Sequence, residues 1–171
     1  MAMEMTAAAV KALLGLEPHP REGGWFAETW RAEEHIVAGA LPARYSGSRA
    51  AGTAIYYLLE PGSFSEMHRL KSDEVFHFYL GDAVEMLRLL PDGTGERVVL
   101  GQDLAEGHYV QTVVPQGVWQ GARLVEGGRF ALLGCTVSPG FDYADYESGS
   151  RAELARGWPE WEEMVRGLTR G

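Results

Sequence analysis

The sequence predicts an all-β domain, either a sandwich or a barrel, and two observations support that prediction. From Thr53 to Val137, short runs of β-type residues alternate with turn residues, and no helical periodicity is long enough to compete. The 171 residues, of which 46% are hydrophobic and 23% charged, match one globular domain. Such regular spacing is typical of sandwiches and barrels. The expected strands are residues 53–60, 64–70, 73–80, 84–90, 97–101, 109–114, 119–125 and 129–137.

The segment before these strands predicts a helix, a further strand and a loop. Thr6 precedes an alanine-rich run that Gly15 closes, which is the pattern of an N-cap and a C-terminal glycine around a short helix. Residues 24–31 hold three aromatic side chains and predict a strand. Residues 38–52 are rich in Gly, Ala, Ser and Arg and predict a mobile loop.

After the strands, the chain changes character. Residues 141–147 mix aromatic and acidic side chains, and we expect a solvated tether that pins its aromatics on the sandwich, with a pocket rim as the alternative. Two short helices are expected near 149–156 and 159–168. We therefore expect one domain over residues 1–171, with a helix and strand in 1–37, a barrel core in 53–140 and helices in 148–168.

Charge and composition narrow the partners. The net charge is −9 and no run of Lys or Arg could follow a phosphate backbone, so nucleic acid is not an expected partner. No apolar run is long enough to span a bilayer, and the N-terminus lacks the pattern of a secretory signal, so we expect a cytoplasmic protein without membrane contact. The lone Cys135 cannot form an internal disulfide and is expected to be buried and unreactive.

Two strands predict a subunit interface. Residues 75–80 and 130–135 are apolar or aromatic at successive positions, whereas a strand with one solvated face should alternate. A contiguous exposed apolar patch normally marks an interaction surface. We therefore expect a homodimer.

The candidate site lies in residues 62–81, which predict one hairpin carrying His68, Glu74 and His77. Unpaired polar side chains are costly among buried strands, so these three need a partner or a function. Side chains alternate along a strand, so if His68 and Glu74 point into a cavity, His77 points to the opposite face, as a structural or interface residue. Hydrogen-bonded structural roles for all three residues are the alternative.

Two short motifs resemble those of the cupin superfamily. Gly62, His68, Leu70, Glu74 and Gly81 follow the spacing of its first motif, in which two histidines and a glutamate bind a metal, but a leucine replaces the second histidine. The segment Val-Pro-Gln-Gly-Val-Trp-Gln at 114–120 is similar to the second motif, but a glutamine, Gln120, replaces the last metal-binding histidine.

Within that superfamily, the chain most resembles the fifth cupin family, long labelled a domain of unknown function. The matching segments are 22–29, 72–79, 114–120 and 134–141. The resemblance implies a jelly-roll β-barrel with short flanking helices, usually dimeric, a pocket at the barrel mouth, and a similarity of shape to the sugar epimerases of the cupin class. It does not imply a particular reaction.

The substitutions in the motifs decide which chemistry we expect. Only His68 and Glu74 remain of the four metal ligands that the resemblance implies, so no tightly bound cofactor is expected, and a divalent metal held by these two residues is the alternative. A histidine beside a carboxylate also suits proton transfer, which makes the pair the candidate catalytic residues. The candidate substrate-binding residues are Gln120, Trp119, Phe76, Phe78, Trp25 and Glu28.

These residues lead to three functional hypotheses. The first is a small-molecule-binding cupin that epimerises or isomerises a sugar or nucleotide sugar through the acid/base pair. The second is a non-catalytic protein that binds or senses a metabolite. The third, with least support, is a metal-dependent dioxygenase.

Overall fold

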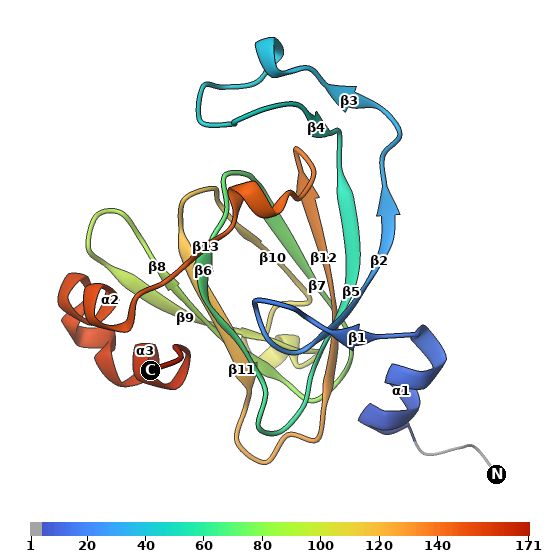
Figure 1. The fold of residues 1–171 in the computed structure, drawn as a ribbon. Coiled ribbons are helices and arrows are strands. Elements are labelled where there is room, and N and C mark those ends of the chain that lie inside the picture. The colour runs from blue at the N-terminus through green and yellow to red at the C-terminus, as the bar shows by residue number, and fades with distance from the viewer. Residues whose placement is uncertain (1–4) are drawn as a thin grey trace.

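The structure, a computed structural model, describes residues 5–171 and forms two antiparallel sheets that face each other (Figure 1). The six-stranded sheet contains, in spatial order, β1 (Glu17–Pro18), β2 (Trp25–Arg31), β5 (Thr53–Leu59), β12 (Ala131–Ser138), β7 (Asp73–Gly81) and β10 (Gln111–Val114). The five-stranded sheet contains β13 (Glu147–Ser148), β6 (Phe64–Arg69), β11 (Trp119–Leu124), β8 (Val84–Leu89) and β9 (Gly95–Leu100). The predicted all-β jelly roll is confirmed.

The chain crosses repeatedly between the two sheets. β5 and β7 belong to the six-stranded sheet, while β6, which lies between them in the sequence, belongs to the five-stranded sheet. The predicted hairpin over residues 62–81 is therefore wrong, because β7 pairs with β12 and β10, whereas β6 pairs with β11 and β13. As a result, residues of β6 and β7 face each other across the barrel instead of lying side by side in one sheet.

A β-bulge in β6 sets the direction of its side chains. His68 pairs with Gln120 and Ser65 pairs with Ala122, so two residues of β6 lie opposite the single residue Gly121 of β11. A bulge adds one residue to one strand and shifts the alternation beyond it. Ser65 and His68 therefore both point into the barrel, where Ser65 donates to Glu22 and His68 lines a cavity. Met67 packs on the outer side, beneath the C-terminal helices.

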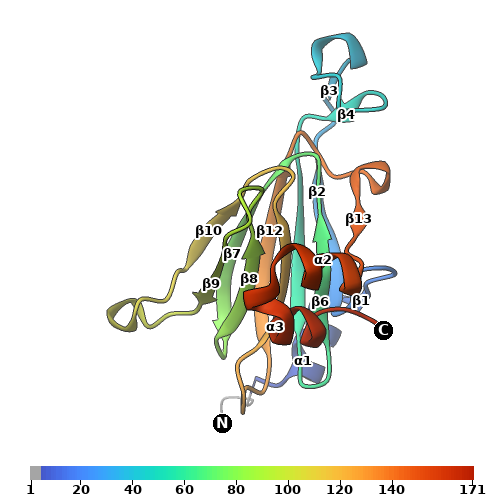
Figure 2. The same cartoon turned by 90° about the vertical axis from the view of Figure 1, so that its left-hand side faces the viewer.

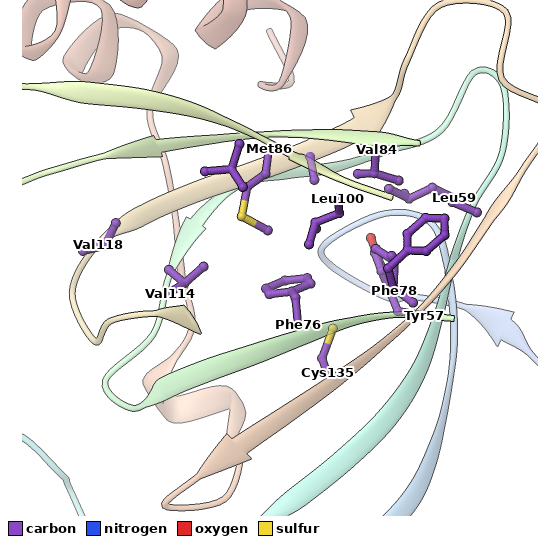
Figure 3. Close-up of a cluster of buried hydrophobic side chains, with 14 residues drawn as sticks. Tyr57, Leu59, Phe76, Phe78, Val84, Met86, Leu100, Val114, Val118 and Cys135 are labelled. Atoms are coloured by element: carbon purple, nitrogen blue, oxygen red, sulfur yellow. The ribbon is translucent and has the colours of Figure 1, made fainter. Parts of the chain in front are cut away.

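Apolar side chains fill one part of the space between the sheets (Figure 3). Phe76 and Phe78 of β7 lie there with residues from both sheets, among them Met86 and Leu100. Burial of this apolar surface is the main favourable contribution to folding. The core therefore closes one part of the barrel and leaves the part near the start of β7 for polar groups.

Short helices cover the outer faces of both sheets (Figure 2). α2 (Arg151–Gly157), a 3-10 turn at Pro159–Trp161 and α3 (Glu162–Gly167) pack on the five-stranded sheet. α1 (Ala7–Leu14) packs on the six-stranded sheet, and it is capped as predicted, with the Ala9 amide donating to the Thr6 hydroxyl at 3.2 Å. Within residues 5–171, no helix combines the length and apolarity needed to cross a membrane.

An excursion of the chain between β2 and β5 extends beyond one end of the barrel (Figure 1). It contains β3 (His35–Ile36), a 3-10 turn (Ala38–Ala40) and β4 (Arg49–Ala50), and β3 pairs with β4. Residues 38–52 are thus not a wholly irregular loop. Arg49 forms a buried ion pair of 2.6 Å with Asp145 in the 3-10 turn Tyr143–Asp145, which ties the base of this excursion to the end of the barrel.

A further 3-10 turn, Leu104–Glu106, lies between β9 and β10.

Candidate functional site

A cavity of about 470 Å³ opens between the sheets at the end of the barrel that lies near the excursion. Its lining comes from β2, β5, β6, β7 and β12, and from the segments before β2 and after β12. The polar residues in the lining are mostly acidic or histidine, and aromatic rings lie among them. A cavity of this size suits a small organic molecule.

His68 of β6 lines the cavity and is 1% exposed. Its Nδ1 lies 2.6 Å from the backbone oxygen of Glu66, and because a carbonyl oxygen only accepts, Nδ1 carries the proton. In the neutral ring, Nε2 is then the basic nitrogen. The imidazole stacks on the ring of Tyr146 with a centroid distance of 4.9 Å, and the Tyr146 hydroxyl donates to the Glu66 carboxylate at 2.8 Å. These contacts fix both the tautomer and the plane of the ring.

Glu74, near the start of β7, lines the cavity from the opposite sheet. Its Oε2 accepts a hydrogen bond of 2.7 Å from Nε2 of Gln120, and the thiol of Cys135 also bonds to this carboxylate. Burial and the nearby charge of Glu22 raise the pKa of Glu74 to about 7, although His68 and the Gln120 hydrogen bond act in the other direction. Near neutral pH, Glu74 is therefore present in both its protonated and its ionised form.

Two further polar residues, which the sequence did not single out, join this pair. Glu22 is 8% exposed and accepts a hydrogen bond of 2.6 Å from the Ser65 hydroxyl. The backbone amide of Glu22 donates to Nδ1 of His19 at 2.9 Å, and Nε2 of the same ring lies 3.7 Å from the Glu22 carboxylate. Burial lowers the pKa of His19, so its ring is neutral at pH 7. The inner wall of the cavity thus contains two carboxyl groups and two imidazoles.

The mouth of the cavity contains an ion pair and several rings. Arg31 donates to both carboxylate oxygens of Glu28, at 3.0 and 2.8 Å, and also to the backbone oxygen of Phe141 at 3.2 Å. The hydrogen bonds to Glu28 raise the pKa of Arg31. Phe141 meets Tyr143 edge-to-face with centroids 4.9 Å apart, and Phe26 also lines the cavity. Of the substrate-binding residues predicted from the sequence, Glu28 is part of this lining.

Gln120, Phe76 and Phe78 lie beside or below the cavity. Gln120 is buried and reaches the site through Glu74. Phe76 and Phe78 point inward like Glu74, but they pack in the core between the sheets (Figure 3). Neither phenylalanine belongs to the cavity wall formed by the described residues, which corrects that part of the predicted lining.

Trp119 and Trp25 are placed on outer faces, and within residues 5–171 neither belongs to the cavity wall. Trp119 packs beneath the C-terminal helices, with the guanidinium of Arg69 4.5 Å from its ring centre. Trp25 packs beside α1, and its indole N–H donates to Glu60 at 2.8 Å. Successive residues of a strand point to opposite faces, so the inward positions of Gln120 and Phe26 require the two tryptophans to point outward.

His77 lies on the outer face of the six-stranded sheet, where alternation from Glu74 places it. Its Nε2 is 3.1 Å from the Thr136 hydroxyl and its Nδ1 is 3.2 Å from the Gln111 amide. The ring is stacked on Tyr79 with centroids 6.2 Å apart. The structure therefore separates His77 from the pair in the cavity.

The donor set does not fit a divalent metal. Among the residues that the structure describes, no three His, Cys, Asp or Glu side chains are grouped so as to hold a metal ion. Leu70, at the position of a ligand in the related motif, lines the cavity with an apolar side chain. Gln120, at another ligand position, donates its amide to Glu74. At the ligand positions of the motifs, only His68 and Glu74 are strong donors, and two fall short of the three or four that protein metal sites use.

Comparison with known proteins finds relatives that are about one-third identical to this chain. A hypothetical protein from Leishmania major is 31% identical and superimposes with a TM-score of 0.88 over 98% of this chain and all of that one. A protein from Shewanella oneidensis is 34% identical, with a TM-score of 0.85 over 97% and 98% of the two chains. An uncharacterised protein from Saccharomyces cerevisiae is 31% identical over 134 residues, which cover 74% of this chain and 67% of the yeast protein.

More distant structures share the fold alone. Oxalate decarboxylase from Bacillus subtilis is 15% identical and superimposes with a TM-score of 0.53 over 90% of this chain and 37% of the enzyme. The family model described as "Cupin superfamily (DUF985)" matches residues 8–149. That match spans both sheets and all the residues that line the cavity. The chain therefore belongs to the cupin superfamily, in the family DUF985.

Proposed function

We propose that the cavity binds a small polar metabolite and that His68 and Glu74 exchange a proton with one of its carbon atoms, as in an epimerase or isomerase. One observation carries the proposal. A histidine with a fixed basic nitrogen and a carboxyl group whose pKa is about 7 line the same cavity from opposite sheets. Groups that are half protonated near the working pH are effective general acids and bases.

The proposed reaction is a proton transfer through a planar intermediate. Nε2 of His68 removes a proton from a carbon next to a carbonyl group, and the electron pair of the C–H bond moves into the resulting enolate. The protonated Glu74 then delivers its own proton to the opposite face of that carbon and becomes a carboxylate. The configuration inverts, and solvent returns a proton to Glu74 and takes one from His68. Gln120 and Cys135 orient the Glu74 carboxyl group throughout.

Solvent isotope exchange tests this proposal. Protein in D₂O is incubated with keto sugars and with any metabolite that copurifies with it, and deuterium at carbon is measured by mass spectrometry and NMR. We expect deuterium at one carbon with wild-type protein, and a rate about 10²–10⁴-fold lower for Glu74→Gln and His68→Gln. A bound ligand that never acquires deuterium contradicts the proposal.

The structure also supports a second candidate function, a binding or sensing protein without turnover. Hydrogen bonds from Gln120 and Ser65 hold the Glu74 and Glu22 carboxyl groups in fixed positions, as suits a preformed set of acceptors for ligand hydroxyls. This candidate predicts saturable binding with no isotope exchange, and a Glu74→Gln variant that loses affinity only. The same D₂O experiment therefore separates the two candidates.

We also propose that the protein is a cytoplasmic homodimer. The outer face of the six-stranded sheet supports the dimer, because Tyr79 and Val113 are each 46% exposed there, beside His77. Exposed aromatic and branched apolar side chains are typical of interfaces. Light scattering measures the mass directly, and Tyr79→Glu together with Val113→Glu should shift it to that of a monomer.

A further inference from the structure

The charges in the cavity limit which ligands it can accept. Four carboxyl groups line it, from Glu22, Glu28, Glu74 and Asp142, while Arg31 is the only Arg or Lys in the lining formed by the described residues. The lining also contains the imidazoles of His19 and His68, and burial lowers the pKa of His19, so that ring is neutral at pH 7. The cavity therefore has an excess of negative charge.

Most of the N–H donors of the single guanidinium are already engaged within the protein. Arg31 uses Nε and Nη2 for Glu28, and it directs Nη1 and Nη2 to the backbone oxygen of Phe141. Recognition of phosphate or carboxylate groups in proteins commonly relies on Arg or Lys donors that can form charge-assisted hydrogen bonds. Here a phosphate would meet carboxyl groups instead, in a partly enclosed space where repulsion is stronger than in water.

The remaining features favour hydroxyl groups. The Glu22 carboxylate and the basic nitrogen of His68 are acceptors, and Glu74 is also an acceptor in its ionised form, so the ligand must supply the donors. Phe26 and Tyr143 add ring faces on which the C–H groups of a sugar can pack. We infer that the cavity binds an uncharged, hydroxyl-rich metabolite, a sugar or polyol without phosphate or carboxylate, and that Glu22 excludes anionic relatives such as nucleotide sugars. The inference rests on the proposed function in one respect: both require that the cavity bind a small molecule. It does not require proton transfer.

A matched ligand series tests the inference. Glucose, galactose and mannose are each titrated into the full-length protein by calorimetry as the free sugar, the uronate and the 6-phosphate, and the best binder is located in crystals. We expect at least one free hexose to bind in the cavity, and its uronate and 6-phosphate to bind at least about tenfold more weakly. An anionic form that binds there more tightly than its parent, or a set in which no free hexose binds, overturns the inference.

Two variants assign the selectivity to the cavity. Glu22→Gln keeps the shape and removes one inner charge, so the affinity for the 6-phosphate relative to that for the free sugar should rise about tenfold. Glu126→Gln makes the same change of net charge at an exposed site away from the cavity and should alter neither. An equal gain for both variants would assign the effect to the overall charge of −9 and overturn the role of Glu22.

A third variant guards against a folding defect. Glu28→Gln acts at the exposed mouth and releases Arg31, so it should also raise the affinity for the 6-phosphate, and an unchanged affinity counts against the inference. The isotope-exchange test of the proposed function can fail while this inference holds. A free hexose that binds as described but acquires no deuterium refutes proton transfer and leaves the ligand class standing.

Discussion

The two parts of the barrel interior use the same strands but are filled in opposite ways. Along one face of β7, Glu74 lines the cavity, while Phe76 and Phe78 pack in the core. In the core, stability comes from apolar area removed from water, whereas in the cavity each polar group needs its own hydrogen bond. The same face of one strand therefore contributes to the apolar core at Phe76 and to the polar cavity two residues earlier, at Glu74.

The carboxyl groups of the cavity show how the polar part is maintained. Glu74 is held by Gln120 and Cys135, Glu22 by Ser65, and His68 by the carbonyl of Glu66. Burial without such partners would be costly for each of them. The hydrogen bonds do not fully offset the effect of burial at Glu74, so its pKa is about 7. The proposed proton transfer depends on this raised pKa.

The largest expected effect is in the apolar part. Phe76 is 1% exposed and packs between the sheets, so Phe76→Ala should lower the free energy of unfolding by about 3–5 kcal/mol. Urea denaturation monitored by tryptophan fluorescence measures this loss. The matched polar change, Glu74→Gln, removes no volume and should not destabilise the protein at pH 7. A loss of several kcal/mol in both variants would show that the two parts do not differ in the way described.

The second effect is a dependence of stability on pH. The pKa of Glu74 is about 7 in the folded protein against 4.5 for an ordinary glutamate, so the folded state binds the proton more tightly than the unfolded state. This contribution to stability is fully present below pH 4.5 and is lost as pH rises through 7. Its size is about 3 kcal/mol.

Urea denaturation between pH 4.5 and 8 measures this contribution as the difference between wild type and Glu74→Gln. Relative to the variant, the wild type should lose stability as pH rises through this window. A difference that does not change with pH would mean that Glu74 has an ordinary pKa in the folded state. Glu22→Gln should lower the midpoint of this dependence, because the charge of Glu22 contributes to the raised pKa.

The architecture could be predicted because its signals are local. Turn residues and alternation fixed the eight main strands to within a few residues, and the Thr6 cap fixed α1. The hairpin over 62–81 was wrong because a tight turn between strands looks the same whether the chain returns in one sheet or crosses to the other. In the structure, the amide of Gly117, distant in sequence, donates to the carbonyl of Leu70 at this corner.

The cavity could be predicted only in part. Alternation placed His68 and Glu74 inward and His77 outward, and the same rule applied to Gln120 would have placed Trp119 outward. Alternation along one strand does not tell whether Phe76 lies in the cavity wall or in the core. That depends on how much of the space between the two sheets is filled by side chains from both of them. His19 and Glu22 come from an irregular segment before β2, where no periodicity indicates direction. The only signal was the motif around Glu22.

The smallest effect concerns the support of His68. In Tyr146→Phe, the ring that stacks on His68 remains, but Glu66 loses the hydroxyl bond of 2.8 Å and keeps the bond of 2.7 Å from Ser148. One neutral donor to a buried carboxylate contributes about 1–3 kcal/mol, so denaturation should show a loss in that range, smaller than for Phe76→Ala. Isotope exchange should fall less than about tenfold, because Nδ1 of His68 still donates to the backbone.

Tyr146→Ala also removes the stacked ring and should slow exchange further. If the two variants reduced exchange equally, the hydroxyl bond alone would orient the base, and the stacked ring would serve only packing.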